Sequence, residues 1–240
     1  MNDQTTPSNF LTVPVAIIIA GALIAAALYF GSMHTGQNMA AAPGDTTAAQ
    51  PQPSVDASKV KADGEPFIGN ANAPAIMAYF SDYQCPFCKQ FEQTKIQQIV
   101  DTEVKTGKLK IIFKDFQFLG DDSQTAGLAA RAVWEVAPDK YYDWRKAMFD
   151  KQDSENSGWG NKDDILALTK TISGIDATKV EQLMTSKQAQ YQQAMDADKA
   201  EGTALGVTGT PTWIIGKQLV QDSAPYSRVD TAIQAALSGK

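Results

Sequence analysis

The chain has 240 residues, a formal net charge of -6 and 43% hydrophobic residues, which is enough for one globular domain of ordinary size plus an additional segment. The acidic balance and the absence of any cluster of Lys and Arg argue against a nucleic-acid-binding surface, because such surfaces neutralise phosphates with basic side chains. Two cysteines and a single histidine, His34, are too few for a zinc site or for a Cys-His nucleophilic pair in the globular part.

Residues 11–30 form an apolar segment without a charged side chain. A helix rises about 1.5 Å per residue, so a helix of this length matches a hydrocarbon core of roughly 30 Å. We therefore predict a transmembrane signal-anchor helix over 11–30, preceded by an N-terminal tail, 1–10. A cleaved signal peptide is the alternative, although the tail has no Lys or Arg and the small-residue run 40–42 lies well beyond the apolar segment. A buried core helix is disfavoured because the polar tract that follows could not cover it.

Residues 31–60 are rich in Ala, Pro, Gly, Ser and Thr and contain no aromatic residue. Such a composition buries little apolar surface and predicts a flexible linker. A coil of this length has an end-to-end distance of about 30 Å, so it would hold a domain near a membrane without pressing it onto the surface. The globular domain is then expected over residues 61–240.

The globular part begins with a β-α-β pattern. The apolar run 75–80 has the length of a buried strand and leads through a polar turn to the motif Cys85–Cys88 (CPFC). Apolar residues at helical spacing follow until Gly107, which provides a stop. The alternating run 108–114 predicts a second strand, with apolar side chains on one face and three lysines, the last of them Lys114, on a wetter face.

The second half of the chain completes the pattern. Helical periodicity occupies about 123–205, where Pro and Gly residues separate about four predicted helices. Two apolar runs around Gly216-Lys217 predict a β-hairpin, and a last helical pattern over 229–237 closes the chain. The order β-α-β, helices, β-β-α predicts an α/β fold of thioredoxin type with a helical insertion.

The cysteine pair at the predicted start of a helix indicates redox chemistry. Unpaired N–H groups and the positive end of the helix dipole stabilise a thiolate at Cys85, which is therefore the expected nucleophile. Its attack on a disulfide gives a mixed disulfide that Cys88 resolves. Pro86 suits the first helical turn, where a missing N–H costs nothing. Half of a zinc site is disfavoured because the other ligands are absent, and a structural disulfide across so short a span would stabilise little.

A second motif, 207–212 (VTGTPT), stands far downstream of the segment 82–88 (DYQCPFC). Together the two motifs resemble those of the DsbA-like thiol:disulfide oxidoreductases, which have a thioredoxin fold, and in particular the membrane-anchored BdbD-type subgroup. The resemblance extends from about residue 66 to the C-terminus. It implies four roles: Cys85 as nucleophile, Cys88 as resolving cysteine, Pro211 as a cis-proline beside them, and Thr210 at the position that contacts substrate.

Two positions depart from the pattern of that family. Many of its members carry a buried glutamate six residues before the first cysteine, where this chain has Tyr79, so the proton-transfer role of that carboxylate is missing or filled elsewhere. The strongly oxidising members have His after the proline of the motif, where this chain has Phe87, which donates no conventional hydrogen bond to a thiolate. Both differences predict a milder redox couple.

The leading hypothesis is a thiol:disulfide oxidase that acts on reduced exported proteins, with its catalytic domain extracytoplasmic, in a periplasm or at the cell exterior. No cofactor or metal motif is present, so the resemblance implies reoxidation by a quinone-linked membrane partner of the DsbB or VKOR type. We expect a monomer, because dimeric isomerases of this kind use an added domain for which the linker leaves no material.

Two alternatives remain open. A reductase or isomerase of the same fold is favoured by Thr210, which resembles the residue before the cis-proline in isomerase relatives. A membrane-tethered peptide-binding or chaperone-like module would instead use a groove near Thr210 and Pro211, with the cysteines merely retained.

Overall fold

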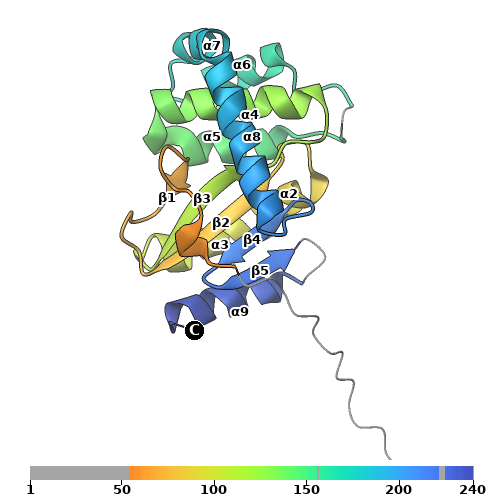
Figure 1. Ribbon diagram of the computed structural model, residues 1–240. Coiled ribbons are helices and arrows are strands. Elements are labelled where there is room, and N and C mark those ends of the chain that lie inside the picture. The colour runs from red at the N-terminus through yellow and green to blue at the C-terminus, as the bar shows by residue number, and fades with distance from the viewer. Residues whose placement is uncertain (1–54, 156, 222–224, 240) are drawn as a thin grey trace, which may run out of the picture. The chain divides into compact units, whose positions relative to one another are not determined.

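The computed structural model describes residues 55–155, 157–221 and 225–239. The predicted membrane anchor, 11–30, lies outside these ranges. Within them, no helix combines the length and the apolar character needed to cross a membrane. The described residues all belong to one compact unit, Gln50–Lys240, which is shown in Figure 1.

A five-stranded sheet with the order β1-β3-β2-β4-β5 forms the centre of this unit. β2 (Ala75–Ser81) and β3 (Leu109–Asp115) pair in parallel, as a β-α-β unit requires. β4 (Thr212–Ile215) pairs antiparallel with β2 and also with β5 (Gln218–Gln221), which confirms the predicted hairpin. A short strand that was not predicted, β1 (Phe67–Ile68), adds antiparallel to β3 at the edge.

One face of the sheet carries the main hydrophobic core. Met77 and Tyr79 of β2 and Ile111 of β3 belong to it and are completely buried. Because side chains alternate along a strand, these residues share one face. The core is covered by the helix that follows the cysteine motif and by the C-terminal helix, α9 (Tyr226–Leu237).

The helix after the cysteine motif is continuous but not uniform. It consists of four consecutive segments: α2 (Pro86–Phe91), a π-helical segment Glu92–Ile96, α3 (Gln97–Ile99) and a second π-helical segment Val100–Val104. Gly107 follows with a φ of 75°, a conformation that glycine adopts without strain. The predicted stop is therefore confirmed.

The opposite face of the sheet has a second apolar cluster, in which Ala78 and Phe80 of β2 are completely buried. The last turns of α8 (Gln188–Ala204) approach closely here. An added Cβ on Gly202 would lie 2.8 Å from the ring of Phe80. Glycine thus allows the helix backbone to rest directly on the aromatic ring.

Residues 55–60 also pack on this second face. Val55, Ala57 and Val60 are buried in its apolar cluster, and the Ala57 N–H donates a hydrogen bond of 2.7 Å to the Gly216 carbonyl. The predicted boundary between linker and domain at residue 60 is therefore corrected, since the last residues assigned to the linker bury apolar side chains against the sheet.

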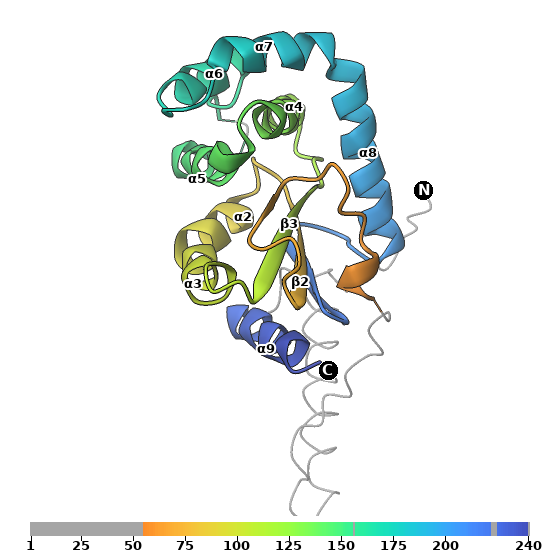
Figure 2. The same cartoon turned by 90° about the vertical axis from the view of Figure 1, so that its left-hand side faces the viewer.

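The insertion between β3 and β4 contains five α-helices in its described part, where about four were predicted. They are α4 (Asp121–Val136), α5 (Tyr141–Lys151), α6 (Lys162–Lys170), α7 (Ala177–Ser186) and α8. The boundary between α7 and α8 consists of the single residue Lys187, which no proline or glycine marks. Figure 2 shows α4 to α7 gathered beyond one end of the strands, while α8 returns along the sheet.

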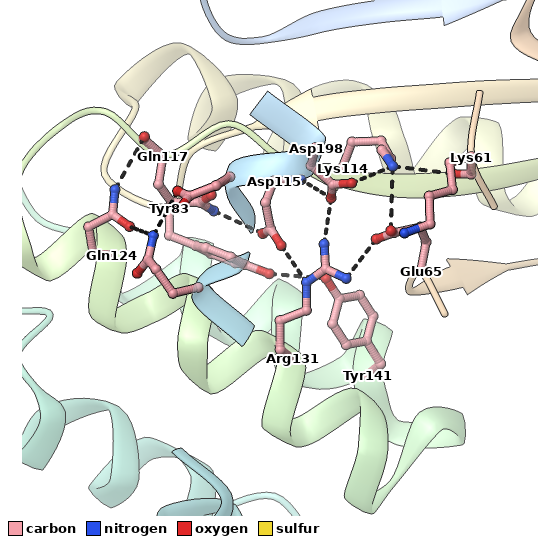
Figure 3. Close-up of polar contacts among 12 residues, drawn as sticks. Lys61, Glu65, Tyr83, Lys114, Asp115, Gln117, Gln124, Arg131, Tyr141 and Asp198 are labelled. Carbon is pink, nitrogen blue, oxygen red and sulfur yellow. Dashed lines mark hydrogen bonds and ion pairs between the residues drawn. The ribbon is translucent and has the colours of Figure 1, made fainter. Parts of the chain in front are cut away.

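A buried group of charged side chains, the ionic cluster, joins the insertion to the sheet (Figure 3). Its members are Glu65, Lys114, Asp115, Arg131, Asp198 and Glu201. Lys114, predicted on a wetter face of its strand, is instead completely buried, because Asp198 and Glu201 of α8 cover it and accept its ammonium group. Four acids meet two bases here. Burial, followed by the charge of Asp115, raises the pKa of Asp198 to about 7 despite the adjacent cations.

Candidate active site

Cys85 and Cys88 lie where β2 leads into α2. Cys85 is the N-cap residue of α2 and Pro86 is its first residue. The Cys85 Sγ accepts a hydrogen bond from the Cys88 backbone N–H at 3.4 Å, which is one of the N–H groups that a helix leaves unpaired in its first turn. Cys88 is completely buried, whereas the Phe87 side chain between the two cysteines is 58% exposed. Only Cys85, with 4% exposure, remains within reach of another sulfur.

The two thiols have opposite electrostatic environments. A hydrogen bond from the Cys88 thiol lowers the pKa of Cys85 to about 7, although burial opposes this effect. Burial raises the pKa of Cys88 well above its ordinary value. At neutral pH Cys85 is therefore substantially a thiolate and Cys88 a neutral thiol, which is the division of labour between an attacking and a resolving cysteine.

The loop that precedes β4 lies against Cys85. The Thr210 carbonyl accepts a hydrogen bond from the Cys85 thiol at 3.2 Å, across 125 positions of sequence. The Thr210-Pro211 peptide bond is cis, and β4 begins at Thr212, immediately after it. The structure thus brings the second sequence motif into contact with the first, and Thr210 and Pro211 stand beside the sulfur.

Tyr79 occupies, in the core, the position at which many members of the resembled family carry a glutamate. Its ring stacks on Trp213 at 5.8 Å and meets the edge of Phe91 at 5.3 Å. Its hydroxyl is buried and has no hydrogen-bond partner among the described residues. Burial, followed by the charge of Cys88, raises the pKa of Tyr79 well above 10. The group at this position therefore stays a neutral phenol.

A buried carboxylate does lie near the motif, but it comes from Glu92. Glu92 pairs with the buried Arg145 of α5 at 2.8 Å, and Arg145 also donates to the Ser81 hydroxyl at 2.9 Å. The guanidinium lies over the rings of Phe113, at 4.3 Å, and Tyr79, at 4.9 Å. Sequence analysis missed this pair, although Glu92 stands four positions after Cys88 and so on the same helix face. Its negative charge is balanced by Arg145.

In this site the first cysteine of the pair caps a helix, and its thiol is hydrogen-bonded to a loop that contains a cis-proline. This arrangement defines a thiol:disulfide exchange protein. Residues 61–235 match the family model described as Thioredoxin. The chain therefore belongs to that family.

Relatives of known function and structure agree with this assignment. The curated Disulfide bond formation protein D of Bacillus subtilis (strain 168) is 27% identical over 177 residues, which cover 74% of this chain and 79% of that protein. The crystal structure of oxidised BdbD from Bacillus subtilis is similar with a TM-score of 0.69 and 26% identity, over 78% of this chain and 98% of that one. The thiol-disulfide exchange protein alpha-DsbA2 from Wolbachia pipientis has a TM-score of 0.62 and 28% identity, over 71% and 86% of the two chains. The thioredoxin-like fold is confirmed, and the protein is a DsbA-like thiol:disulfide oxidoreductase.

Proposed function

We propose that this protein oxidises pairs of cysteines in reduced exported proteins, with Cys85 as the reactive cysteine and Cys88 as the resolving one. The carrying observation is that the Cys85 sulfur accepts the Cys88 N–H at the start of α2. Stabilising the Cys85 thiolate stabilises the reduced form of the pair, and a couple with a stabilised reduced form is the stronger oxidant.

The exchange proceeds in two balanced steps. A substrate thiolate attacks Sγ of Cys85, the Cys85–Cys88 bond breaks, and its electron pair goes to Cys88, which takes up a proton as a buried thiol of raised pKa. A second substrate thiolate then attacks the substrate sulfur of the mixed disulfide, and Cys85 leaves as a thiolate. The substrate gains a disulfide, and the protein leaves with both cysteines reduced.

The flanking residues have supporting roles in this proposal. Pro86 starts α2 at the motif. Phe87 is exposed beside Cys85 and contacts the substrate. Thr210 and Pro211 place backbone next to the reacting sulfur, where a substrate peptide could pair with it. Neither Tyr79 nor Phe87 adds a charge, which supports a couple milder than that of the strongest oxidases.

The cellular setting completes the proposal. In this proposal residues 11–30 anchor the chain in a membrane, and the segment from 31 to about 54 links the anchor to a monomeric catalytic domain. That domain is extracytoplasmic, because disulfides persist in oxidising compartments. A quinone-linked membrane protein of the DsbB or VKOR type reoxidises the cysteine pair. Disulfide bond formation in the name of the Bacillus subtilis relative supports an oxidising compartment.

Oxidative refolding of a reduced test protein examines the proposal directly. The oxidised full-length protein in detergent should accelerate recovery of activity, and the Cys85→Ser variant should not. Equal rates with both proteins would contradict the oxidase function.

A reductase of the same fold is the second candidate, favoured by the neutral Tyr79 and by Thr210. Equilibration with glutathione separates the two. A potential near that of thioredoxin, about -270 mV, indicates a reductase, and a clearly higher one indicates an oxidase. A peptide-binding module, by contrast, would keep its biological activity in the Cys85→Ser and Cys88→Ser variants.

A further inference from the structure

Arg145 belongs to the helical insertion, yet it binds the chain on both sides of the cysteine motif. Its helix, α5, lies beside α2 and the π-helical segment that follows α2 (Figure 2). The buried guanidinium donates to the Glu92 carboxylate at 2.8 Å, to the Tyr83 hydroxyl at 3.3 Å and to the Ser81 hydroxyl at 2.9 Å. Ser81 and Tyr83 come before Cys85 in the sequence, and Glu92 comes after the motif. One side chain therefore ties together the two segments that flank the cysteines.

The end of α5 makes a second connection of the same kind. Gln152, its C-cap residue, donates through its side-chain amide to the Tyr83 carbonyl at 2.9 Å. The backbone carbonyl of Gln152 accepts the ammonium group of Lys89, which belongs to α2. The ring of Tyr83 also stacks on Phe149 of α5 at 5.2 Å. The insertion thus holds both the turn before the cysteines and the helix after them.

The contacts of Arg145 are better suited to fixing geometry than to adding stability. A buried ion pair is weak evidence for stability, because packed apolar residues of similar volume often do as well. A guanidinium is a rigid planar fork, so its nitrogens can bind several partners at once in fixed directions. Here the partners lie where β2 turns into α2. Cys85 caps α2 at this turn, and its sulfur meets the Cys88 N–H at 3.4 Å, so this hydrogen bond depends on how the turn is held.

We propose that Arg145 is a positioning residue of the redox site, which holds the turn before Cys85 against the start of α2 so that the Cys88 N–H points at the Cys85 sulfur. Arg145 acts through the side chains that it binds rather than on the sulfur itself. The reactivity of the cysteine pair then depends on the insertion as well as on the motif. This inference rests on the proposed function, in which Cys85 is the reactive cysteine.

Arg145→Lys separates position from charge. Lysine keeps a positive charge beside Glu92 but lacks the fork, so it cannot hold the two flanking segments together. Arg131→Lys is the matched control, because Arg131 is also a buried arginine of the insertion and binds three carboxylates of the ionic cluster. The control should lower stability without moving the turn that carries Cys85.

The assay measures the rate of alkylation of the reduced full-length protein in detergent over a pH series, with the modified cysteine identified by mass spectrometry. We expect Arg145→Lys to raise the midpoint of Cys85 alkylation by about one pH unit, which lowers the thiolate fraction at pH 7 about fivefold. Arg131→Lys should keep the wild-type midpoint. Tyr83→Phe, which removes one acceptor, should raise the midpoint by less and cause no further shift when combined with Arg145→Lys.

A double variant, Arg145→Met with Glu92→Leu, tests the electrostatic explanation, because it removes both charges of the pair together. If position matters, its midpoint stays raised as in Arg145→Lys. A return to the wild-type midpoint would assign the effect to charge and overturn the inference. Tyr79 and Tyr226, whose ionisation is coupled to that of Cys85, have raised pKa values and stay neutral below pH 9, so they do not obscure the comparison.

The remaining outcomes separate this inference from the function on which it rests. Equal midpoints for Arg145→Lys and the wild type overturn the inference and leave the oxidase function standing. A shift that Arg131→Lys shares also overturns it, because general loosening of the insertion would then be the cause. Should Arg145→Lys fold poorly, Tyr83→Phe decides, and an unchanged midpoint in that variant contradicts the inference. Labelling of Cys88 instead of Cys85 in the wild type would overturn the proposed roles of the two cysteines themselves.

Discussion

The sulfur of Cys85 accepts a hydrogen bond from the backbone N–H of Cys88 at 3.4 Å, and the Cys88 thiol is also the group that most lowers the pKa of Cys85. The second cysteine therefore stabilises the thiolate of the first, in addition to the resolving role that we propose for it. The same burial that protects Cys88 prevents it from acting as a nucleophile toward external disulfides.

In the reduced protein, alkylation of Cys85 should reach half of its maximal rate near pH 7, because only the thiolate reacts and an ordinary cysteine titrates near 8.5. Rapid alkylation over a pH series, with the modified cysteine identified by mass spectrometry, measures this. Cys88→Ala should move the midpoint upward. An unchanged midpoint in that variant would show that Cys88 does not stabilise the thiolate.

The stability of the reduced protein should rise from about pH 7 to about pH 8.5 and fall at higher pH. Cys85 has a lower pKa folded than unfolded, so the unfolded chain binds more protons in that window and unfolding becomes less favourable as pH rises. The contribution of Cys85 is lost as pH falls through 7. Cys88 has a raised pKa when folded, so it acts in the opposite direction above about 8.5. Urea unfolding of both redox forms tests this, because the oxidised protein lacks both titrations and should show neither trend.

Replacing Arg145 by Met should lower the free energy of unfolding by about 3–5 kcal/mol, because Glu92 would remain as a buried charge without its partner. Urea denaturation measures the loss. Adding Glu92→Leu to that variant should restore part of the stability, since the uncompensated charge is removed. The exposed Arg228→Met is the matched control and should change little. A double variant no more stable than Arg145→Met would assign the loss to packing on Phe113 and Tyr79 rather than to the charge.

Arg131→Met should destabilise the protein more strongly at pH 8 than at pH 5. Arg131 contacts three carboxylates, those of Glu65, Asp115 and Asp198, which would repel one another without it. Asp198 has a pKa of about 7 in the folded protein, above the ordinary 3.8, so it favours the folded state at low pH and this contribution is lost as pH rises through 7. Protonation at pH 5 therefore removes part of the repulsion. Thermal unfolding of Arg131→Met at both pH values, with Arg228→Met as control, measures the loss of stability. An equal loss at pH 5 and pH 8 would argue against protonation of Asp198 as the source of the difference.

Local sequence patterns were enough to predict several strands and helices of this protein and the position of its cysteine motif. The apolar run 75–80 and the turn at Gly216 specify a strand and a hairpin, because run length and turn chemistry depend on only a few neighbouring residues. Cys85 and Pro86 stand between a predicted strand and a predicted helix, and this position alone predicts a nucleophilic cysteine at a helix N-terminus. The sequence also placed the insertion, although not the division between α7 and α8 at Lys187.

Tertiary packing alone decided which distant groups meet. Lys114 lies at an alternating position that reads as solvent-facing, yet α8 covers it and turns it into the centre of an ionic cluster. Glu92 pairs with Arg145, which lies 53 positions away in the sequence. Asp82 accepts a hydrogen bond from the backbone N–H of Phe118, 36 positions away. Such partners depend on how the insertion folds back onto the sheet, and no local pattern encodes that. The cysteine motif can be recognised from four residues, but its contact with Thr210, 125 positions away, depends on the fold of the whole domain.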